Sequence, residues 1–206
     1  MTEPFNPLDM DNLGLSVGTA LLTSEPHPLD AVPSFYGAGV YAIYYHGPLP
    51  YYSALVTATE GGEVPVEVPI YVGKAVPEGA RIGVSITEGA KTRALSSRLK
   101  KHAASIRAAA TNLDIADFTC RWLVVEPIWI PLGESVTIAR FAPVWNVIVA
   151  GFGNHDPGQG RREGLRTRWD TLHPGRSFAP FFVERAETAE DIANDIREYL
   201  AQRYQV

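Results

Sequence analysis

Two side chains four residues apart, Arg98 and His102, are well placed in this sequence to carry out chemistry. They fall in the stretch 92–110, where apolar residues recur at helical spacing: Leu95, Leu99, Ala103 and Ile106. At about 100° per residue, His102 lies inside the apolar stripe and Arg98 at its edge. Polar groups on a buried face need partners, because unpaired burial is costly. A lone histidine there is ordinarily a core residue, whereas a side-by-side pair favours a functional site.

The elements that must position this pair are two β-prone runs, 39–45 and 68–73. Val, Ile and Tyr favour strands, and Gly-Pro and Gly-Gly between the runs favour turns. We predict two strands that pair side by side, with Tyr41 on one and Tyr71 on the other. A tyrosine in such a run ordinarily packs in a sheet. The polar residues that follow favour a site instead: Lys74, Arg98, His102, Glu134 and Asn146.

The order of these residues resembles the GIY-YIG nuclease superfamily. The matching segments are Gly39-Val-Tyr41, Tyr71-Val-Gly73, Arg98-Leu-Lys-Lys-His102, Glu134 and Phe141-Ala-Pro-Val-Trp-Asn146. A second tract, Gly151-Phe-Gly-Asn-His-Asp-Pro-Gly158 with Trp169-Asp-Thr-Leu-His-Pro-Gly-Arg176, is similar to a narrower branch. That branch contains type II restriction endonucleases that cut a GC-only palindrome, with CCGCGG as the candidate site. The link between the tyrosine strands, 46–69, is longer than is usual in the family.

The resemblance implies phosphodiester hydrolysis, which needs an activated water and charge relief on the phosphate. Glu134 would hold one divalent cation, Mg²⁺, whose preference for oxygen suits a carboxylate, phosphate and waters. Arg98 would clamp the scissile phosphate with its planar fork. Either Tyr41 or His102 would activate the water, and the sequence leaves this choice open. Three residues would have supporting roles: Tyr71 would bond the phosphate or polarise its neighbour, Lys74 would help to stabilise charge, and Asn146 would brace the site.

Glu134 begins a predicted short helix, 133–141, which Pro143 ends. At a helix N-terminus the dipole favours an ionised carboxylate. An ordinary first-turn glutamate is the alternative, and the family pattern favours the metal ligand. The run 118–126 before it predicts a third strand, in which the single cysteine, Cys120, is a buried thiol.

The net charge of −5 argues at first against a nucleic-acid partner, but its distribution does not. Residues 1–73 carry eight acidic side chains and no Lys or Arg, whereas 74–183 carry fifteen Lys and Arg against nine acids. Residues 184–206 are again acidic, with six acids against three bases. A basic middle between acidic ends can present a positive face.

The segment 151–183 is rich in glycine and arginine, a composition typical of loops that contact DNA. Arginine forks bind guanine O6 and N7 in the major groove, which suits a GC-only target. We expect base or phosphate contacts from seven residues: Arg81, Lys91, Arg161, Arg162, Arg166, Arg168 and Arg176. His155 and His173 lack the cysteine pair of a typical zinc site.

At 206 residues one nuclease domain is expected. We divide it into an N-terminal arm (1–35, with a helical stretch 13–22), a catalytic core (36–150), the DNA-recognition segment (151–183) and a C-terminal helix (184–206) packing on the core or on a second subunit. One cysteine, no membrane-length apolar run and no basic signal region predict a cytoplasmic protein.

The predicted fold is α/β (α+β): a small, mainly antiparallel central sheet flanked by helices, with the site on one face of the sheet. The predicted function is Mg²⁺-dependent cleavage of double-stranded DNA at a palindrome by a homodimer, with a cognate methyltransferase encoded separately. Three alternatives stay open: a structure-specific repair nuclease, a non-catalytic DNA-binding module, and a small-molecule enzyme, for which the sequence shows no nucleotide fingerprint.

Overall fold

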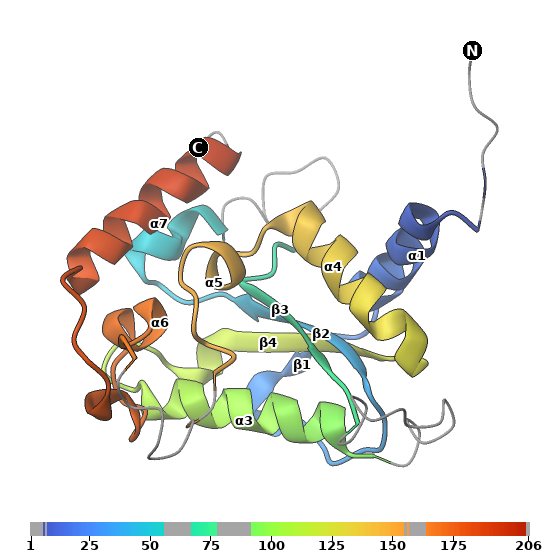
Figure 1. Cartoon of the computed structure of the whole chain (residues 1–206), viewed down its shortest axis with the longest axis horizontal. Coiled ribbons are helices and arrows are strands. Elements are labelled where there is room, and N and C mark those ends of the chain that lie inside the picture. Colours follow the sequence, from blue (N-terminus) through green and yellow to red (C-terminus); the bar gives the residue numbers. More distant parts are fainter. Residues whose placement is uncertain are drawn as a thin grey trace.

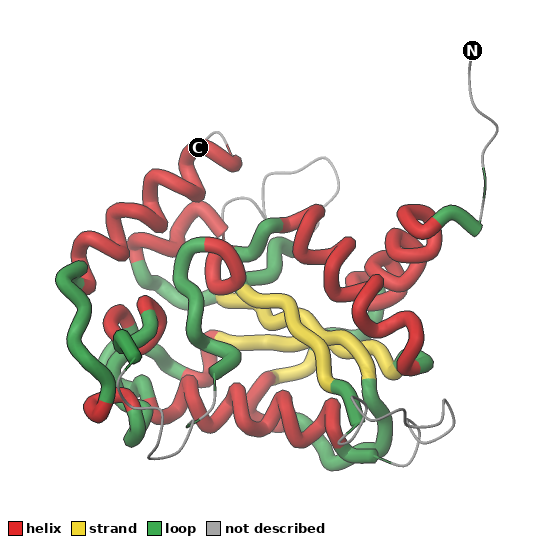
Figure 2. Tube along the Cα trace, in the orientation of Figure 1, coloured by secondary structure: helices red, strands yellow, loops and turns green. Residues whose placement is uncertain are grey.

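A four-stranded antiparallel sheet forms the centre of the computed structural model, which describes residues 6, 8–55, 67–77, 92–154, 156 and 164–204. Its strand order is β1-β4-β2-β3. The strands are β1 (His27–Pro28), β2 (Gly39–Tyr45), β3 (Tyr71–Ala75) and β4 (Phe118–Val124). The α-helices are α1 (Met10–Leu22), α3 (Ala94–Ala108), α4 (Ile130–Phe141), α5 (Val144–Val147), α6 (Arg168–Leu172) and α7 (Ala189–Tyr204). Helices lie on both sides of the sheet, which confirms the predicted fold (Figures 1 and 2).

Strand β2 lies in the middle of the sheet, and all seven of its residues are buried. Because side chains alternate along a strand, it serves two cores. Tyr41 and Ile43 face the larger core, which receives the apolar stripe of α3, and Val40 and Ala42 face a smaller core under α1 and α4. The two predicted tyrosine strands do pair, antiparallel, with Tyr41 opposite Gly73.

Helices α1 and α4 pack closely through small residues. A side chain added at Gly14 would meet Val136 at 2.3 Å, and one at Gly133 would meet Val17 at 2.5 Å. The predicted helix 13–22 is present, and it begins earlier, at Met10, where the Asp9 carboxylate accepts a hydrogen bond from the Asp11 amide. The N-terminal stretch thus covers one face of the sheet.

Several predicted boundaries move by a few residues. Strand β3 begins at Tyr71 rather than 68, because Pro69 has no amide hydrogen to donate to a ladder. Helix α4 begins at Ile130 rather than 133, with Pro131 in its first turn, where a missing amide hydrogen costs nothing. Glu134 therefore lies in the second turn, and the expectation that the helix N-terminus stabilises its carboxylate is wrong.

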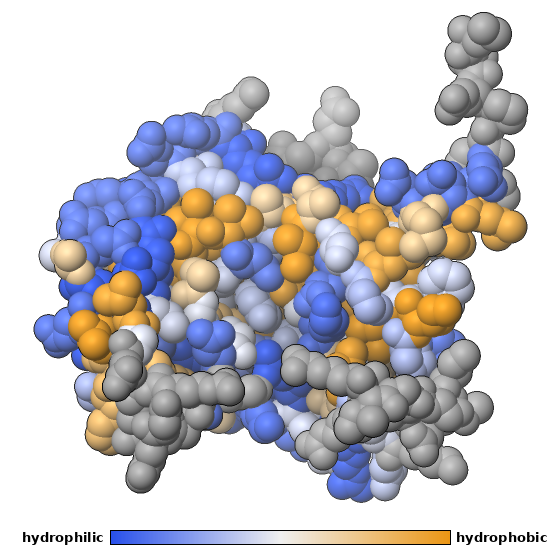
Figure 3. Space-filling view, viewed as in Figure 1, coloured by the Kyte–Doolittle hydropathy of each residue, from blue (hydrophilic) through white to orange (hydrophobic). Residues whose placement is uncertain are grey.

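The C-terminal helix α7 begins at Ala189 and packs its apolar side on the core, with Ile192, Ile196 and Leu200 buried. Thr188 and Asp191 cap its start through two reciprocal hydrogen bonds. The Asp191 carboxylate accepts a hydrogen bond from the Thr188 amide, and the Thr188 hydroxyl accepts one from the Asp191 amide. Its outer surface is mostly hydrophilic, whereas apolar side chains gather over α1 and α4 (Figure 3).

Cys120 is buried in β4, as predicted, and burial raises the pKa of its thiol to about 12. No helix in the described ranges is both long enough and apolar enough to span a bilayer.

Candidate active site

Tyr41, Arg98 and His102 meet on the α3 side of the sheet. The Tyr41 hydroxyl lies 2.6 Å from His102 Nε2, and Arg98 Nε donates to the same hydroxyl at 3.4 Å. Because the guanidinium can only donate, it takes a lone pair of the tyrosine oxygen. Between the hydroxyl and His102 Nε2 either group can donate, depending on which imidazole nitrogen carries the hydrogen. The predicted pair on α3 therefore points at the tyrosine strands.

The glycines of both triplets are required by close approaches. A Cβ at Gly73 would lie 2.5 Å from the Tyr41 hydroxyl, because the tyrosine ring crosses the strand directly opposite. A Cβ at Gly39 would lie 1.9 Å from the Leu123 carbonyl oxygen in β4. Gly73 therefore leaves room for the tyrosine, and Gly39 lets β2 lie close against β4.

Tyr71 lies next to this group and, like Arg98, is only partly buried, whereas Tyr41 and His102 are buried. The rings of Tyr41 and Tyr71 are 6.2 Å apart. Burial raises the pKa of Tyr71, the Arg98 charge lowers it, and the Glu134 charge raises it. Burial also raises the pKa of Tyr41 well above its usual range, with Tyr71 adding to the rise and Arg98 opposing it. Both phenols are therefore protonated at neutral pH.

The turn 151–154, which the sequence analysis assigned to the DNA-recognition segment, closes the cluster of Tyr41, Tyr71, Arg98 and His102. Gly153 accepts a hydrogen bond on its carbonyl oxygen from Arg98 Nη2 at 2.9 Å. The Phe152 ring stacks on His102, with centroids 4.5 Å apart, and meets Tyr71 edge-on at 5.0 Å. The signal that could have indicated this role is Gly-Phe-Gly, an aromatic residue between two glycines, one of which has a positive φ.

Asn146 holds the edge strand β3 through its side-chain amide. Its side-chain oxygen accepts from the Val72 amide at 2.9 Å, and its side-chain nitrogen donates to the Val72 carbonyl at 2.8 Å. Strand β3 is an edge strand, so the asparagine amide satisfies backbone groups that a further strand would otherwise pair.

Lys74 and Glu134 form a second group, on the other face of the sheet. Lys74 Nζ lies 2.6 Å from Glu134 Oε2. The expectation of a site on one face is wrong in this respect, because strand alternation turns Lys74 away from Gly73 and toward α4. The two groups lie on either side of the edge strand β3, and the effect of Glu134 on the pKa of Tyr71 shows that they are within electrostatic reach.

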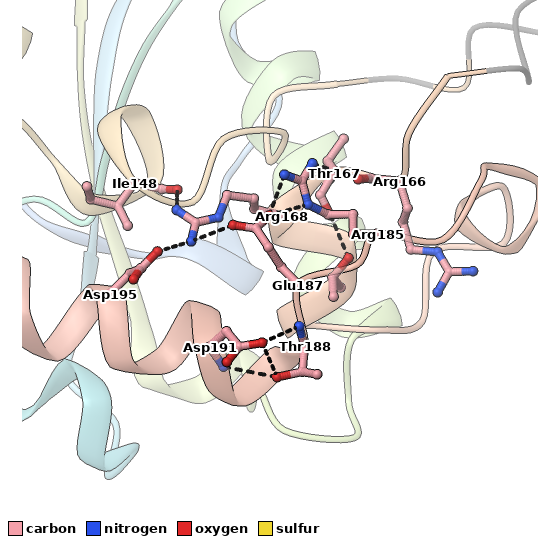
Figure 4. A network of polar contacts seen from close by, with 10 residues as sticks. Ile148, Arg166, Thr167, Arg168, Arg185, Glu187, Thr188, Asp191 and Asp195 are labelled. Atoms are coloured by element: carbon pink, nitrogen blue, oxygen red, sulfur yellow. Dashed lines mark hydrogen bonds and ion pairs between the residues drawn. The ribbon is translucent and has the colours of Figure 1, made fainter.

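The predicted DNA-contacting arginines have different environments. Arg81, Lys91, Arg161 and Arg162 lie outside the described residues, as does His155. Arg168 donates to the Ile148 carbonyl and pairs with Glu187 and Asp195 (Figure 4). Arg166 donates to the Ala179 carbonyl and pairs with Glu184 at 3.5 Å. Arg166 and Arg168 would have to exchange these carboxylates for DNA.

The expectation that Arg176 contacts DNA is wrong, because this side chain is 4% exposed and forms an ion pair with Asp170 inside the fold. A buried guanidinium with internal partners is not placed to read a base. The density of arginines was visible in the sequence, but the carboxylate and carbonyl partners that tertiary folding supplies were not.

His173 also belongs to the core. Its Nδ1 lies 2.9 Å from the Asn112 side-chain oxygen, and its Nε2 lies 2.8 Å from the Tyr52 hydroxyl, which accepts from the Trp145 indole. Burial lowers its pKa to about 3, so the ring is neutral. Both ring nitrogens are engaged within the protein, which leaves neither for a metal.

Residues 33–200 match the model of a protein family described as the Eco29kI GIY-YIG domain. The chain belongs to this family. Because the Eco29kI GIY-YIG family is one of restriction endonucleases, the resemblance seen in the sequence is confirmed, and the chain is a nuclease with DNA as its substrate. The central antiparallel sheet with flanking helices agrees with a GIY-YIG core. No curated protein matches the chain.

Proposed function

We propose that this Eco29kI-family nuclease is a Mg²⁺-dependent type II restriction endonuclease that cuts both strands of a GC-only palindrome. The observation that carries the proposal is the meeting of Tyr41, Arg98 and His102 beside Tyr71, with Glu134 across the edge strand. Restriction by a homodimer suits a palindrome, since symmetric DNA matches a twofold protein with one site per strand. A separately encoded methyltransferase would protect the host's own sites.

The donor set on β3 and α4 fits a Mg²⁺ ion held by few protein groups. In the part of the chain that the structure describes, no three His, Cys, Asp or Glu side chains gather around a common centre. Glu134, whose charge is close enough to Tyr71 to raise the pKa of that phenol, would hold the ion, with phosphate and water oxygens as the other ligands, a pattern that Mg²⁺ favours. When bound, the ion relieves the negative charge of the phosphate. Lys74, whose Nζ now neutralises Glu134, would turn to the substrate.

Arg98 and Tyr71 are the partly exposed members of the cluster and would contact the substrate. The Arg98 guanidinium is held at Nη2 by Gly153 and at Nε by Tyr41, which orients its fork for the phosphate. Oriented donors of this kind stabilise the charge that develops on phosphate without reorganising during the reaction.

The buried pair Tyr41 and His102 supports a proton relay rather than a single base. In this relay the His102 hydrogen is on Nδ1, so the tyrosine passes its own hydrogen to Nε2 as its oxygen takes a proton from the attacking water. A bond forms between the water oxygen and phosphorus, the bond to the leaving sugar oxygen breaks, and that oxygen takes a proton from solvent. The 2.6 Å separation between hydroxyl and imidazole is suited to such a transfer.

Incubation with plasmid DNA and Mg²⁺ tests the proposal. Discrete fragments support restriction, nicking that follows DNA structure points to a repair nuclease, and binding without cutting points to a non-catalytic module. Glu134→Gln removes the proposed metal charge while keeping the shape, and we expect it to abolish cleavage and leave DNA binding largely intact. Glu126→Gln, the same change at a carboxylate just before α4, is the control and should cut normally. Near-normal cleavage by Glu134→Gln would exclude Glu134 as the ligand.

A further inference from the structure

Arg176 forms a buried, two-point ion pair. Its Nε and Nη2 each donate to a carboxylate oxygen of Asp170 at 2.6 Å. The guanidinium lies 4.6 Å from the ring centroid of Trp169 and 4.9 Å from that of Phe178. A charge so buried is retained only with complete compensation, because an unpaired guanidinium would be very costly.

The remaining hydrogens of Arg176 all go to one turn, 151–154. Nη1 donates to the carbonyl oxygens of Phe152 and Asn154, each at 3.1 Å, and Nη2 donates to that of Gly151 at 3.0 Å. With the two bonds to Asp170, this makes five hydrogen bonds for the five N–H groups of a guanidinium. No other side chain has this set of donors, since lysine offers three on a single nitrogen.

The same turn touches three members of the catalytic cluster. The carbonyl of Gly153 accepts from Arg98 Nη2, and the Phe152 ring contacts both His102 and Tyr71. A Cβ at Gly153 would lie 2.6 Å from the Tyr71 hydroxyl, so the turn has little freedom to shift. The carbonyls of Gly151, Phe152 and Asn154 face Arg176, and that of Gly153 faces Arg98.

We propose that Arg176, held by Asp170, is a positioning residue for cleavage. It fixes the turn 151–154 so that the Gly153 carbonyl orients Arg98 toward the scissile phosphate. The proposal rests on the proposed function, in which Arg98 contacts that phosphate. It also gives one role to the turn 151–154 and to Asp170 and Arg176, which lie in the segment that the sequence associated with DNA recognition.

Arg176→Lys keeps the charge and loses the planar fork. We expect it to lower kcat at least tenfold with KM for DNA within about threefold of wild type, since misplacing a catalytic group by 1 Å can cost about 10²-fold. Arg121→Lys is the matched control. Arg121 is partly buried, pairs with Glu67 and, like Arg176, donates to a backbone carbonyl, that of Ser24, but it lies on the opposite face of the sheet. It should leave kcat unchanged.

A double-mutant cycle with Arg98→Ala separates positioning from loss of stability. If Arg176 acts through Arg98, Arg176→Lys should slow the Arg98→Ala protein by less than threefold. Additive losses, or a wild-type kcat for Arg176→Lys, would overturn the inference. Wild-type cleavage by Arg98→Ala would instead overturn the proposed function. Asp170→Asn, which keeps the acceptor oxygen, repeats the test if Arg176→Lys folds poorly.

A readout that does not depend on cleavage is the NMR signal of the Arg98 Nε–H group, assigned by its loss in Arg98→Ala. Arg176→Lys should shift or broaden this signal, because Arg98 loses its fixed carbonyl partner, whereas Arg121→Lys should not. An unchanged signal in a folded Arg176→Lys protein would refute the positioning role even if the chain cuts no DNA.

Discussion

The substitution Gly73→Ala tests how tightly Tyr41, the tyrosine of the proposed proton relay, is held in place. Gly73 lies directly opposite Tyr41 in the β2–β3 ladder, and its backbone does not have a positive φ. Alanine can therefore adopt the same backbone conformation, and any effect must come from the added methyl group. That methyl would lie 2.5 Å from the Tyr41 hydroxyl and 2.7 Å from the ring carbon that bears it.

The size of the effect follows from these distances. Ordinary contact begins at 3.4 Å, so the hydroxyl has to retreat by about 0.9 Å from its present 2.5 Å. A retreat of that size away from His102 would lengthen the 2.6 Å contact to about 3.5 Å, outside hydrogen-bonding range. Misplacement of about 1 Å costs on the order of 10²-fold in rate. Overpacking a fully buried ring costs about 1–3 kcal/mol of stability.

Single-turnover cleavage of the cognate duplex with excess protein measures the rate without contributions from product release, and urea unfolding measures the stability. Gly164→Ala is the control, because its methyl would meet Phe182 at an ordinary 3.8 Å. We expect about a 10²-fold slower reaction for Gly73→Ala and no change for Gly164→Ala. If Gly73→Ala cleaves within threefold of wild type, either Tyr41 is not wedged as described or its position does not limit the reaction.

Three further predictions concern histidines and arginines. His102→Ala should slow turnover by orders of magnitude and remove the acid limb of the pH–rate profile. An unchanged profile would show that His102 has a structural role only. Burial lowers the pKa of His173 from 6.5 to about 3, so between these values the unfolded chain binds more protons than the folded protein. The free energy of unfolding should therefore decrease as the pH falls below about 6.5, by up to about 5 kcal/mol, and His173→Gln should make urea midpoints less dependent on pH in that range. Replacing a base-reading arginine by alanine should reduce the favourable binding free energy by about 1–3 kcal/mol and relax the preference for one G·C pair. Losing a phosphate contact should instead weaken binding to all sequences and reduce its salt dependence. Titrations against single-base variants of the site distinguish these outcomes for Arg161, Arg162, Arg166 and Arg168.

Much of the fold could be predicted because its signals are local. The apolar stripe of α3 and the β-prone runs of β2 and β4 depend on residues a few positions apart. Errors arose at element ends, where proline changes the outcome: Pro69 delays β3, and Pro131 is accommodated in the first turn of α4. That second shift moved Glu134 away from the helix terminus and so removed the reason given for its charge.

The sequence by itself determined the order of the polar residues, the pairing of Arg98 with His102 on one helix, and the family. Only the tertiary structure decided which partner each group has. The register of β2 against β3 places Tyr41 over Gly73, and strand alternation places Lys74 with Glu134 on the other face. Arg176 belongs to the core because its five acceptors come from Asp170 and the turn 151–154. Contacts between segments far apart in sequence depend on packing and register, which local composition does not encode.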